Sequence, residues 1–159
     1  MGQNLELIIV RDFAAPREAL WQAWTEAERV RRWWGSRHFT SPFSSIDLRV
    51  GGSYLHCIRT PDGREYWSTG VYREFVPPEK LVLTDSFADE RGNVVPATYY
   101  GLGEDFPSEL LVTVTFKARD RDTTMTLRHA GVPSKGMLEQ MREGWNGSFD
   151  KLDDLLARH

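Results

Sequence analysis

Apolar and polar residues alternate along most of this chain, a pattern typical of β-strands that bury one face. The first such segment is rich in β-branched residues and ends at Phe13. Paired glycines and a Pro-Asp-Gly sequence interrupt the alternation and predict tight turns. The segments predicted to be strands are 5–13, 44–50, 54–59, 65–76, 81–87, 110–117 and 123–129.

Two short helices are predicted between the first strand and the second. Pro16 is suited to the first position of a helix, and the apolar residues that follow it recur every three or four positions. Residues 25–28 (Thr-Glu-Ala-Glu) match a capping box and predict the start of the second helix. Gly35 is expected to end that helix.

The hydrophobic period changes after Pro133. From Leu138 to Leu156 the apolar residues are three or four positions apart, which predicts an amphipathic helix of about six turns. Gly144 and Gly147 lie within it, although each glycine inside a helix costs about 0.8–1 kcal/mol relative to alanine. We therefore expect a close backbone approach, a bend or open space beside these two glycines.

The predicted order of elements is β–α–α–β–β–β–β–β–β–α, and short connections between the strands favour hairpins. This order places the chain in the α+β class, with an antiparallel sheet of six to seven strands. The long C-terminal helix is expected to cover the apolar face of that sheet. Residues 88–107 form a long connection without a periodic pattern, and a loop of this length is usually functional or mobile.

Length and charge exclude several classes of protein. With 159 residues, 40% of them hydrophobic, the chain is predicted to form a single domain spanning 1–159. Its net charge of −3 disfavours nucleic-acid binding. No apolar run is long enough to insert into a membrane, and residues 1–4 do not begin a secretory leader. We therefore expect a cytoplasmic protein without membrane insertion.

Eight short motifs occur in order along the chain. They are Ala15-Pro16-Arg17-Glu18, Trp24-Thr25-Glu26, Arg32-Trp33-Trp34-Gly35, Asp47-Leu48-Arg49-Val50-Gly51-Gly52, Pro61-Asp62-Gly63, Gly70-Val71-Tyr72, Thr113-Val114-Thr115-Phe116 and Glu143-Gly144-Trp145-Asn146. This series resembles the SRPBCC proteins, and within them the activator of Hsp90 ATPase homologue branch. The resemblance implies a helix-grip fold, in which a curved antiparallel sheet wraps around the long C-terminal helix.

The resemblance also implies an apolar cavity between the sheet and the long helix. Together with the many aromatic residues and the paired glycines of the last helix, this cavity predicts binding of a small hydrophobic molecule, aromatic or lipid-like. The long connection over 88–107 is the predicted lid. Two alternatives stay open. One is an enzyme of the cyclase or hydrolase kind that uses the same cavity. The other is a co-chaperone-like protein-interaction module, which the single domain without a further partner-binding region disfavours.

Aromatic residues form 12% of the chain and come from every element expected to border such a cavity. Core packing is expected for most of them, and contact with a flat ligand for the others. Trp145 is the strongest candidate because the nearby glycines leave space beside it. If exposed, Trp34 or Tyr99-Tyr100 would equally suit the contact of a homodimer. The residues predicted to bind the ligand are Trp33, Tyr54, His56, Trp67, Asp85, Phe87, Tyr99, Tyr100, Phe116, His129, Met141, Trp145 and Phe149.

The alternation predicts that Asp85, His56 and His129 point inward. Asp85 and one of these histidines would then form an acid–base pair. An inward carboxylate must be paired or have a raised pKa. Asp85 with either histidine is therefore the catalytic candidate. For both histidines, a hydrogen bond within the core is the more common role of such a residue than contact with a ligand.

Other chemistry finds little support in the sequence. The four histidines are scattered, and no dinucleotide or serine-nucleophile motif occurs, so neither a metal nor a cofactor is predicted. The single cysteine, Cys57, is expected to be a small buried residue. The basic residues around Trp33-Trp34 are expected to form a solvated helix face, with a phosphate or acidic partner as the alternative. These basic residues are Arg29, Arg31, Arg32, Arg37 and His38.

Overall fold

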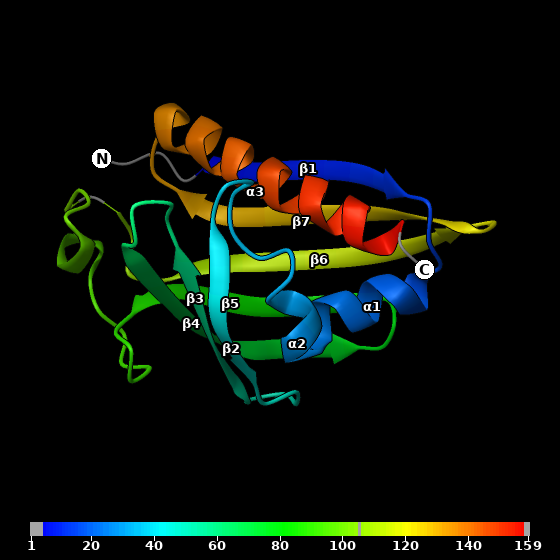
Figure 1. Ribbon diagram of the computed structural model, residues 1–159, viewed down its shortest axis with the longest axis horizontal. Coiled ribbons are helices and arrows are strands. Elements are labelled where there is room, and N and C mark those ends of the chain that lie inside the picture. Colours follow the sequence, from blue (N-terminus) through cyan, green and yellow to red (C-terminus); the bar gives the residue numbers. More distant parts are fainter. Residues whose placement is uncertain (1–4, 105, 158–159) are drawn as a thin grey trace.

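The computed structural model describes residues 5–104 and 106–157. The prediction about a secretory leader concerns residues 1–4, which lie outside this part of the chain. The described residues form strands, α-helices and one short 3-10 helix (Figure 1). The elements are β1 (Leu5–Phe13), α1 (Arg17–Thr25), α2 (Ala27–Val30), β2 (Thr40–Ile46), β3 (Ser53–Arg59), β4 (Glu65–Val76), β5 (Lys80–Ala88), η1 (Ala97–Tyr100), β6 (Leu110–Arg119), β7 (Asp122–Val132) and α3 (Lys135–Leu156).

The strands form one antiparallel sheet in the order β1-β7-β6-β5-β4-β3-β2. Strands β2 to β7 follow one another as a meander, and β1 joins the sheet beside β7. Figure 1 shows the curved sheet with α3 lying along one face, α1 near the C-terminal end of that helix, and α2 next to α1. The α+β class and the helix-grip arrangement predicted from the sequence are therefore confirmed.

The strand predicted over 44–50 is shifted toward the N-terminus. It forms over Thr40–Ile46, and the chain then turns tightly between Asp47 and Gly52. The backbone N–H of Asp47 donates to Ser53 O, and that of Gly52 donates to Arg49 O. The prediction was wrong here because apolar residues also alternate with polar ones in this turn, although residues 48–50 pair with no strand of the described chain.

The predicted capping box was also wrong. Thr25 is the last residue of α1, and its hydroxyl donates to the carbonyl oxygen of Trp21 at 2.7 Å. Helix α2 covers only Ala27–Val30, and its N-cap residue, Glu26, makes no side-chain cap hydrogen bond. A helix of one turn depends on its packing for stability, so a cap signal carries little weight there.

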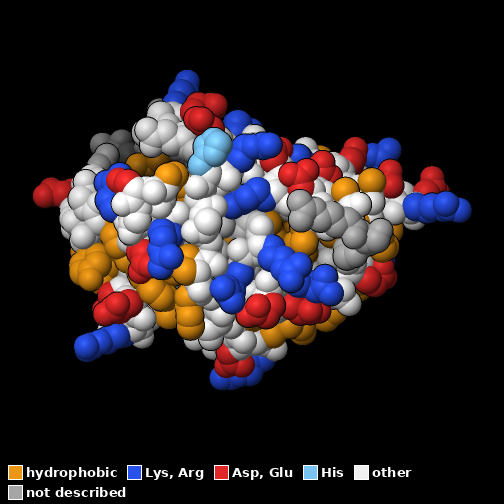
Figure 2. All heavy atoms as spheres, in the orientation of Figure 1, with side chains coloured by type: hydrophobic (Ala, Val, Ile, Leu, Met, Phe, Trp, Pro, Cys, Tyr) orange, Lys and Arg blue, Asp and Glu red, His pale blue; other side chains and the backbone are white. Residues whose placement is uncertain are grey.

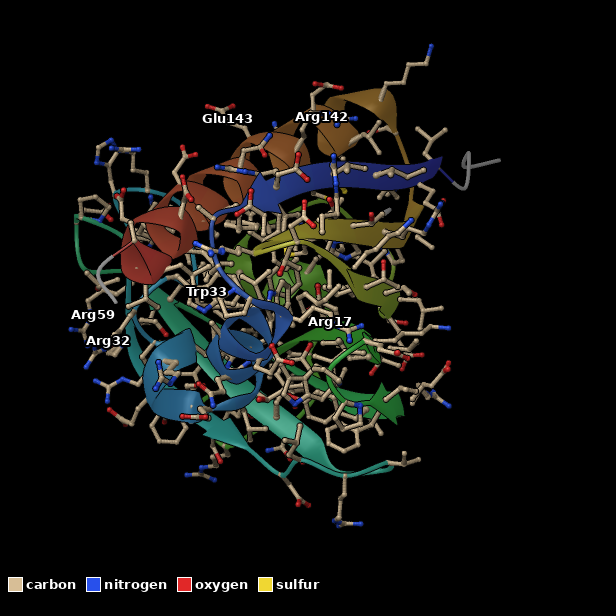
Figure 3. All side chains as sticks on the ribbon, turned by 90° about the vertical axis from the view of Figure 1, so that its right-hand side faces the viewer. Arg17, Arg32, Trp33, Arg59, Arg142 and Glu143 are labelled. Atoms are coloured by element: carbon tan, nitrogen blue, oxygen red, sulfur yellow. The ribbon has the colours of Figure 1, made fainter. Side chains whose placement is uncertain are left out.

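The core lies between the sheet, α1 and α3. Trp33 is fully buried and lies inside the molecule, whereas Arg32 and Arg59 point outward (Figure 3). The indole N–H of Trp33 donates to Ala23 O at 2.9 Å, so its polar edge is satisfied within the core. Cys57 is buried as expected. The largest fully buried side chains are Trp33, Phe13, Phe149, Leu7, Leu20, Leu81, Met125, Leu127 and Leu152.

The connection over 88–107 is attached to the sheet. The hydroxyl of Tyr100 accepts a hydrogen bond from the backbone N–H of Trp67 at 3.0 Å and donates one to Ala88 O. The neighbouring Tyr99 is 60% exposed. A role of this loop as a lid, and a role of Tyr99 in a homodimer, stay predictions.

The basic residues around Trp33-Trp34 lie at the surface with acidic neighbours. Figure 2 shows Lys and Arg side chains interspersed with Asp and Glu on this face. Arg29 is 2.9 Å from Glu26, and Arg37 is 3.6 Å from Asp150. This pairing favours the solvated face over an anion site. Within residues 5–104 and 106–157, no helix is long and apolar enough to cross a membrane.

Candidate functional site

A cavity of about 230 Å³ lies between the sheet and α3. Its wall is largely aromatic and aliphatic, with several serines and two titratable side chains. Pockets of this kind, apolar with a few polar groups that converge, are typical of small-molecule sites. The residues that line the cavity are Trp34, Gly35, Ser36, Ile58, Ser68, Asp85, Ser86, Phe87, Phe106, Leu110, His129, Met141, Gly144, Trp145 and Ser148.

Five of the predicted ligand-binding residues meet at this cavity. Asp85 and Phe87 are two positions apart on β5, so both point to the same face of the sheet. Met141 and Trp145 are four positions apart on α3 and therefore share one side of the helix. His129 comes from β7 and completes the group.

The other predicted ligand-binding residues do not line the cavity. Trp33, Phe116 and Phe149 belong to the packed core. Core packing is the role that the sequence analysis expected for most of the aromatic residues. Tyr54 and His56 are buried, and each contacts a residue of the cavity wall, Asp85 and Trp34 respectively. Their part in ligand binding stays a prediction. The residues outside the cavity wall are Trp33, Tyr54, His56, Trp67, Tyr99, Tyr100, Phe116 and Phe149.

The ligand-binding residues predicted from the sequence omit most of the small residues in the wall, and also Trp34, Ile58, Phe106 and Leu110. Serines on strands carry no signal for a cavity, because a short polar side chain suits an exposed position equally well. Phe106 could have been found, since it is an aromatic residue at the end of the long loop. It lies 5.3 Å from Phe87, measured between ring centroids. The loop over 88–107 thus contributes one wall of the cavity.

Asp85 and His129, one of the two pairings predicted for acid–base chemistry, lie close together, and their catalytic role stays a prediction. The side chain of His129 is 4% exposed, and its Nε2 lies 3.4 Å from Asp85 Oδ2. This contact lacks the alignment of a hydrogen bond, so Nε2 has no hydrogen-bond partner within the described part of the chain. The other ring nitrogen, Nδ1, accepts a hydrogen bond from the indole Nε1 of Trp145 at 3.1 Å.

His56 occupies a different place, between the rings of Tyr54 and Trp34. Both ring centroids lie 4.7 Å from that of His56. Its Nδ1 is 2.7 Å from the hydroxyl of Ser44. Burial lowers the pKa of His56 to about 3, and the negative charge of Asp85 opposes the shift only in part. His56 is therefore neutral at physiological pH and is satisfied within the core.

Tyr54 connects His56 to Asp85. Its hydroxyl donates to the carbonyl oxygen of Thr84 at 2.7 Å and lies 3.5 Å from Asp85 Oδ1. Burial, and then the charge of Asp85, raises the pKa of Tyr54 well above its ordinary value. Tyr54 is thus a neutral hydrogen-bond donor beneath the cavity. Among the residues that the structure describes, no three His, Cys, Asp or Glu side chains are grouped as metal ligands.

The two glycines of α3 have different roles. A Cβ on Gly147 would lie 2.8 Å from the backbone nitrogen of Arg37, so this glycine permits a close backbone approach. Gly144 lines the cavity, and a Cβ there would meet only the hydroxyl of Ser36, at 3.5 Å. The two expectations of a close approach and of open space are both met, each at one glycine.

Lys151 holds the segment that crosses α3 near these glycines. Its ammonium donates to Phe39 O at 3.0 Å and to Trp34 O at 3.4 Å. Partial burial lowers the pKa of Lys151. Both carbonyls belong to the segment that carries Trp34, Gly35 and Ser36 along the cavity wall.

Lys151→Met is expected to lower the free energy of unfolding by roughly 1–2 kcal/mol, because two carbonyl oxygens lose a charged donor while the apolar stem is kept. Urea unfolding at neutral pH measures the change. Lys117→Met, at an exposed position of β6, serves as the control and should leave the free energy nearly unchanged. Equal stability of the two variants would contradict a role of Lys151 in holding this segment.

The comparisons with known proteins agree with the fold. The family model for activator of Hsp90 ATPase homolog 1-like protein matches residues 14–157. A search of curated proteins gave no significant match. The SRPBCC fold, to which this family belongs, is one that commonly binds hydrophobic ligands.

Solved structures cover nearly the whole chain. A protein from Mycobacterium smegmatis is 27% identical with a TM-score of 0.77, over 96% of this chain and 90% of that one. A protein from Arthrobacter aurescens is 26% identical with a TM-score of 0.78, over 98% of this chain and 87% of that one. The AHSA1 protein from Silicibacter pomeroyi shares the fold. It is 22% identical with a TM-score of 0.77, over 98% of this chain and 100% of that one. Since the family model spans all but the ends of the sequence, the chain belongs to the activator of Hsp90 ATPase homolog 1-like family of the SRPBCC superfamily.

Proposed function

We propose that this protein binds a small apolar molecule of one or two rings in the cavity between the sheet and α3. The observation that carries the proposal is the cavity itself, about 230 Å³ with a wall built largely of aromatic and aliphatic side chains. An engineered protein cavity of about 150 Å³ accommodates benzene, so the present volume suits up to two fused rings.

Its shape and chemistry favour a flat ligand. The rings of Trp34 and Trp145 are nearly perpendicular, with an interplanar angle of 89° and centroids 5.4 Å apart. Phe87 and Phe106 contribute two more rings to the wall. Aromatic faces and edges arranged in this way complement a planar apolar molecule. The pocket is partly open to solvent, so it is the aromatic wall, and not the volume, that favours the aromatic form of the prediction over the lipid-like one.

Naphthalene is the probe that tests the proposal. Isothermal titration calorimetry should show saturable binding with one site per chain. Gly144→Leu should weaken this binding about tenfold or more, since a leucine side chain would occupy the cavity and 1.4 kcal/mol corresponds to a factor of ten. The substitution is compatible with the helix, because leucine favours helices and a Cβ at Gly144 meets ordinary contact distances.

Gly136→Leu is the matched control. It makes the same change in the same helix, at an exposed position where a Cβ would meet nothing within 4 Å. This variant should bind naphthalene as the wild type does. Failure of the wild type to bind either naphthalene or its hydroxylated analogue 2-naphthol, or equal naphthalene binding by both leucine variants, would contradict a ligand site in this cavity.

The two alternatives named from the sequence stay predictions. An enzyme of the cyclase or hydrolase kind would use the same cavity, and Asp85 and His129 are the side chains that could serve it. Chaperone binding has no feature of the described residues in its favour beyond the name of the family. We likewise retain a cytoplasmic location as part of the proposal.

A further inference from the structure

The cavity wall holds a histidine whose tautomer is set by its neighbour. His129 is 3% exposed, and its Nδ1 lies 3.1 Å from the indole nitrogen of Trp145. An indole N–H can only donate a hydrogen bond, so Nδ1 must be the acceptor and carries no proton. Because a neutral imidazole has one N–H group, the proton of His129 is on Nε2.

The protonated nitrogen lies beside Asp85 in the cavity wall and has no hydrogen-bond partner among the described residues. Nε2 of His129 makes no hydrogen bond to any residue within 5–104 and 106–157. Asp85 Oδ2 is 3.4 Å away, and both side chains line the cavity. A buried donor that lacks a partner is costly, which is why such groups are rare except where a ligand or water meets them.

We propose that His129 and Asp85 together bind one hydroxyl group of the ligand, and that Trp145 sets this specificity by holding the tautomer of His129. This inference rests on the proposed function of the cavity. A hydroxyl oxygen can accept the Nε2–H of His129 while its own proton is donated to the Asp85 carboxylate. The ligand is therefore a neutral phenol or aromatic alcohol of one or two rings.

Other polar groups fit this pair less well. A ligand carboxylate would accept from His129 but would be repelled by the negative charge of Asp85. An unsubstituted hydrocarbon would leave the donor and the acceptor unpaired after it had displaced water from them. A site built to hydrogen-bond a hydroxyl discriminates strongly against the analogue that lacks it, for this reason.

The same geometry restricts the chemistry that His129 could perform. While Trp145 donates to Nδ1, the other ring nitrogen of His129 carries the N–H and has no lone pair with which to accept a proton. His129 therefore acts there as a hydrogen-bond donor and not as a base. If the cavity carried out proton transfer, Asp85 would be the group that accepts the proton.

Three probes of similar size distinguish these possibilities: 2-naphthol, naphthalene and 2-naphthoate. Calorimetry with the wild type at neutral pH should show 2-naphthol binding about tenfold or more tightly than naphthalene, as expected for added hydrogen bonds that include a charged acceptor. The 2-naphthoate anion should bind more weakly than naphthalene. Asp85→Asn should strengthen 2-naphthoate binding about tenfold, because the repelling charge is removed.

Trp145→Phe tests the positioning role. The phenyl ring keeps an aromatic wall but has no N–H, so the preference for 2-naphthol over naphthalene should fall below about threefold while naphthalene still binds. Trp21→Phe, the same change outside the cavity wall, should keep the wild-type preference. The ¹⁵N chemical shifts of the His129 ring give an independent readout. They should show Nε2 protonated in the wild type, and both tautomers in Trp145→Phe.

The outcomes separate the inference from the proposed function. If neither naphthalene nor 2-naphthol binds the wild type, the proposed function itself is overturned. If the two bind equally, the cavity binds ligands but the hydroxyl site is overturned. Protonation of Nδ1 in the wild type, an unchanged preference in Trp145→Phe, or an unchanged affinity of Asp85→Asn for 2-naphthoate would each overturn it as well.

Discussion

Replacing Gly70 by alanine is expected to lower the free energy of unfolding by about 3 kcal/mol or more, an effect at the upper end for one added methyl group. A Cβ on Gly70 would stand 1.8 Å from the carbonyl oxygen of Thr84 and 2.6 Å from its carbonyl carbon. Both atoms belong to the backbone of β5, so no side-chain rotation relieves the clash. The Cβ would also lie 2.8 Å from the ring of Tyr54.

The close approach at Gly70 serves the cavity. The backbone N–H of Val71 donates to the hydroxyl of Thr84 at 2.8 Å, and the hydroxyl of Tyr54 donates to Thr84 O. These bonds fix β4 and β5 at the position just before Asp85. A methyl group at Gly70 would push Thr84 away and move Asp85 with it, so we also expect weaker 2-naphthol binding.

Urea unfolding of Gly70→Ala and of Gly136→Ala measures the effect. Gly136 lies in α3 with open space around it, so alanine there should leave the protein as stable or stabilise it by up to about 1 kcal/mol. The contrast between two identical changes isolates the steric cause. A Gly70→Ala variant as stable as the wild type would show that β5 can move aside without cost.

The stability of the wild type is expected to fall steeply in mild acid because of His56. Burial lowers the pKa of this residue from 6.5 to about 3 in the folded state. Between these two values the unfolded chain binds the proton and the folded chain does not, so stability declines as the pH falls through this range. From pH 6.5 to about pH 4.5 this one group accounts for roughly 2–3 kcal/mol.

His56→Gln should flatten this part of the pH profile. Glutamine does not titrate and can still hydrogen-bond to Ser44, although it loses the ring contacts and so lowers stability at neutral pH. The measurement is urea unfolding at several pH values for both proteins. His38→Gln changes an exposed histidine and should leave the wild-type slope in place. Parallel profiles for the wild type and His56→Gln would contradict the lowered pKa.

The local pattern of apolar and polar residues was sufficient to predict the long elements. Alternation predicted six of the strands nearly as they form, and the three-to-four spacing predicted α3, because a long segment buries a continuous face only in one conformation. The pattern was insufficient for β2 and for the start of α2. Both are short, and tertiary contacts decide where such elements begin and end.

The residues of the candidate site were likewise predictable only in part. Alternation predicted that Asp85 and His129 point inward, because successive side chains of a strand lie on only two faces of the sheet. For Trp33 and Trp34, adjacent residues of one turn, the sequence gives no comparable rule. The structure puts the first in the core and the second on the cavity wall.

By itself the sequence determined the class of fold, the order of its elements and the faces on which Asp85, His129 and Trp145 lie. Only the tertiary structure decided that a cavity remains between them, and that the indole of Trp145 reaches Nδ1 of His129. The reason is physical: periodicity depends on the direction of side chains from one backbone. A cavity and a hydrogen bond between a strand and a helix depend on the distance between two backbones, which the packing of the whole core sets.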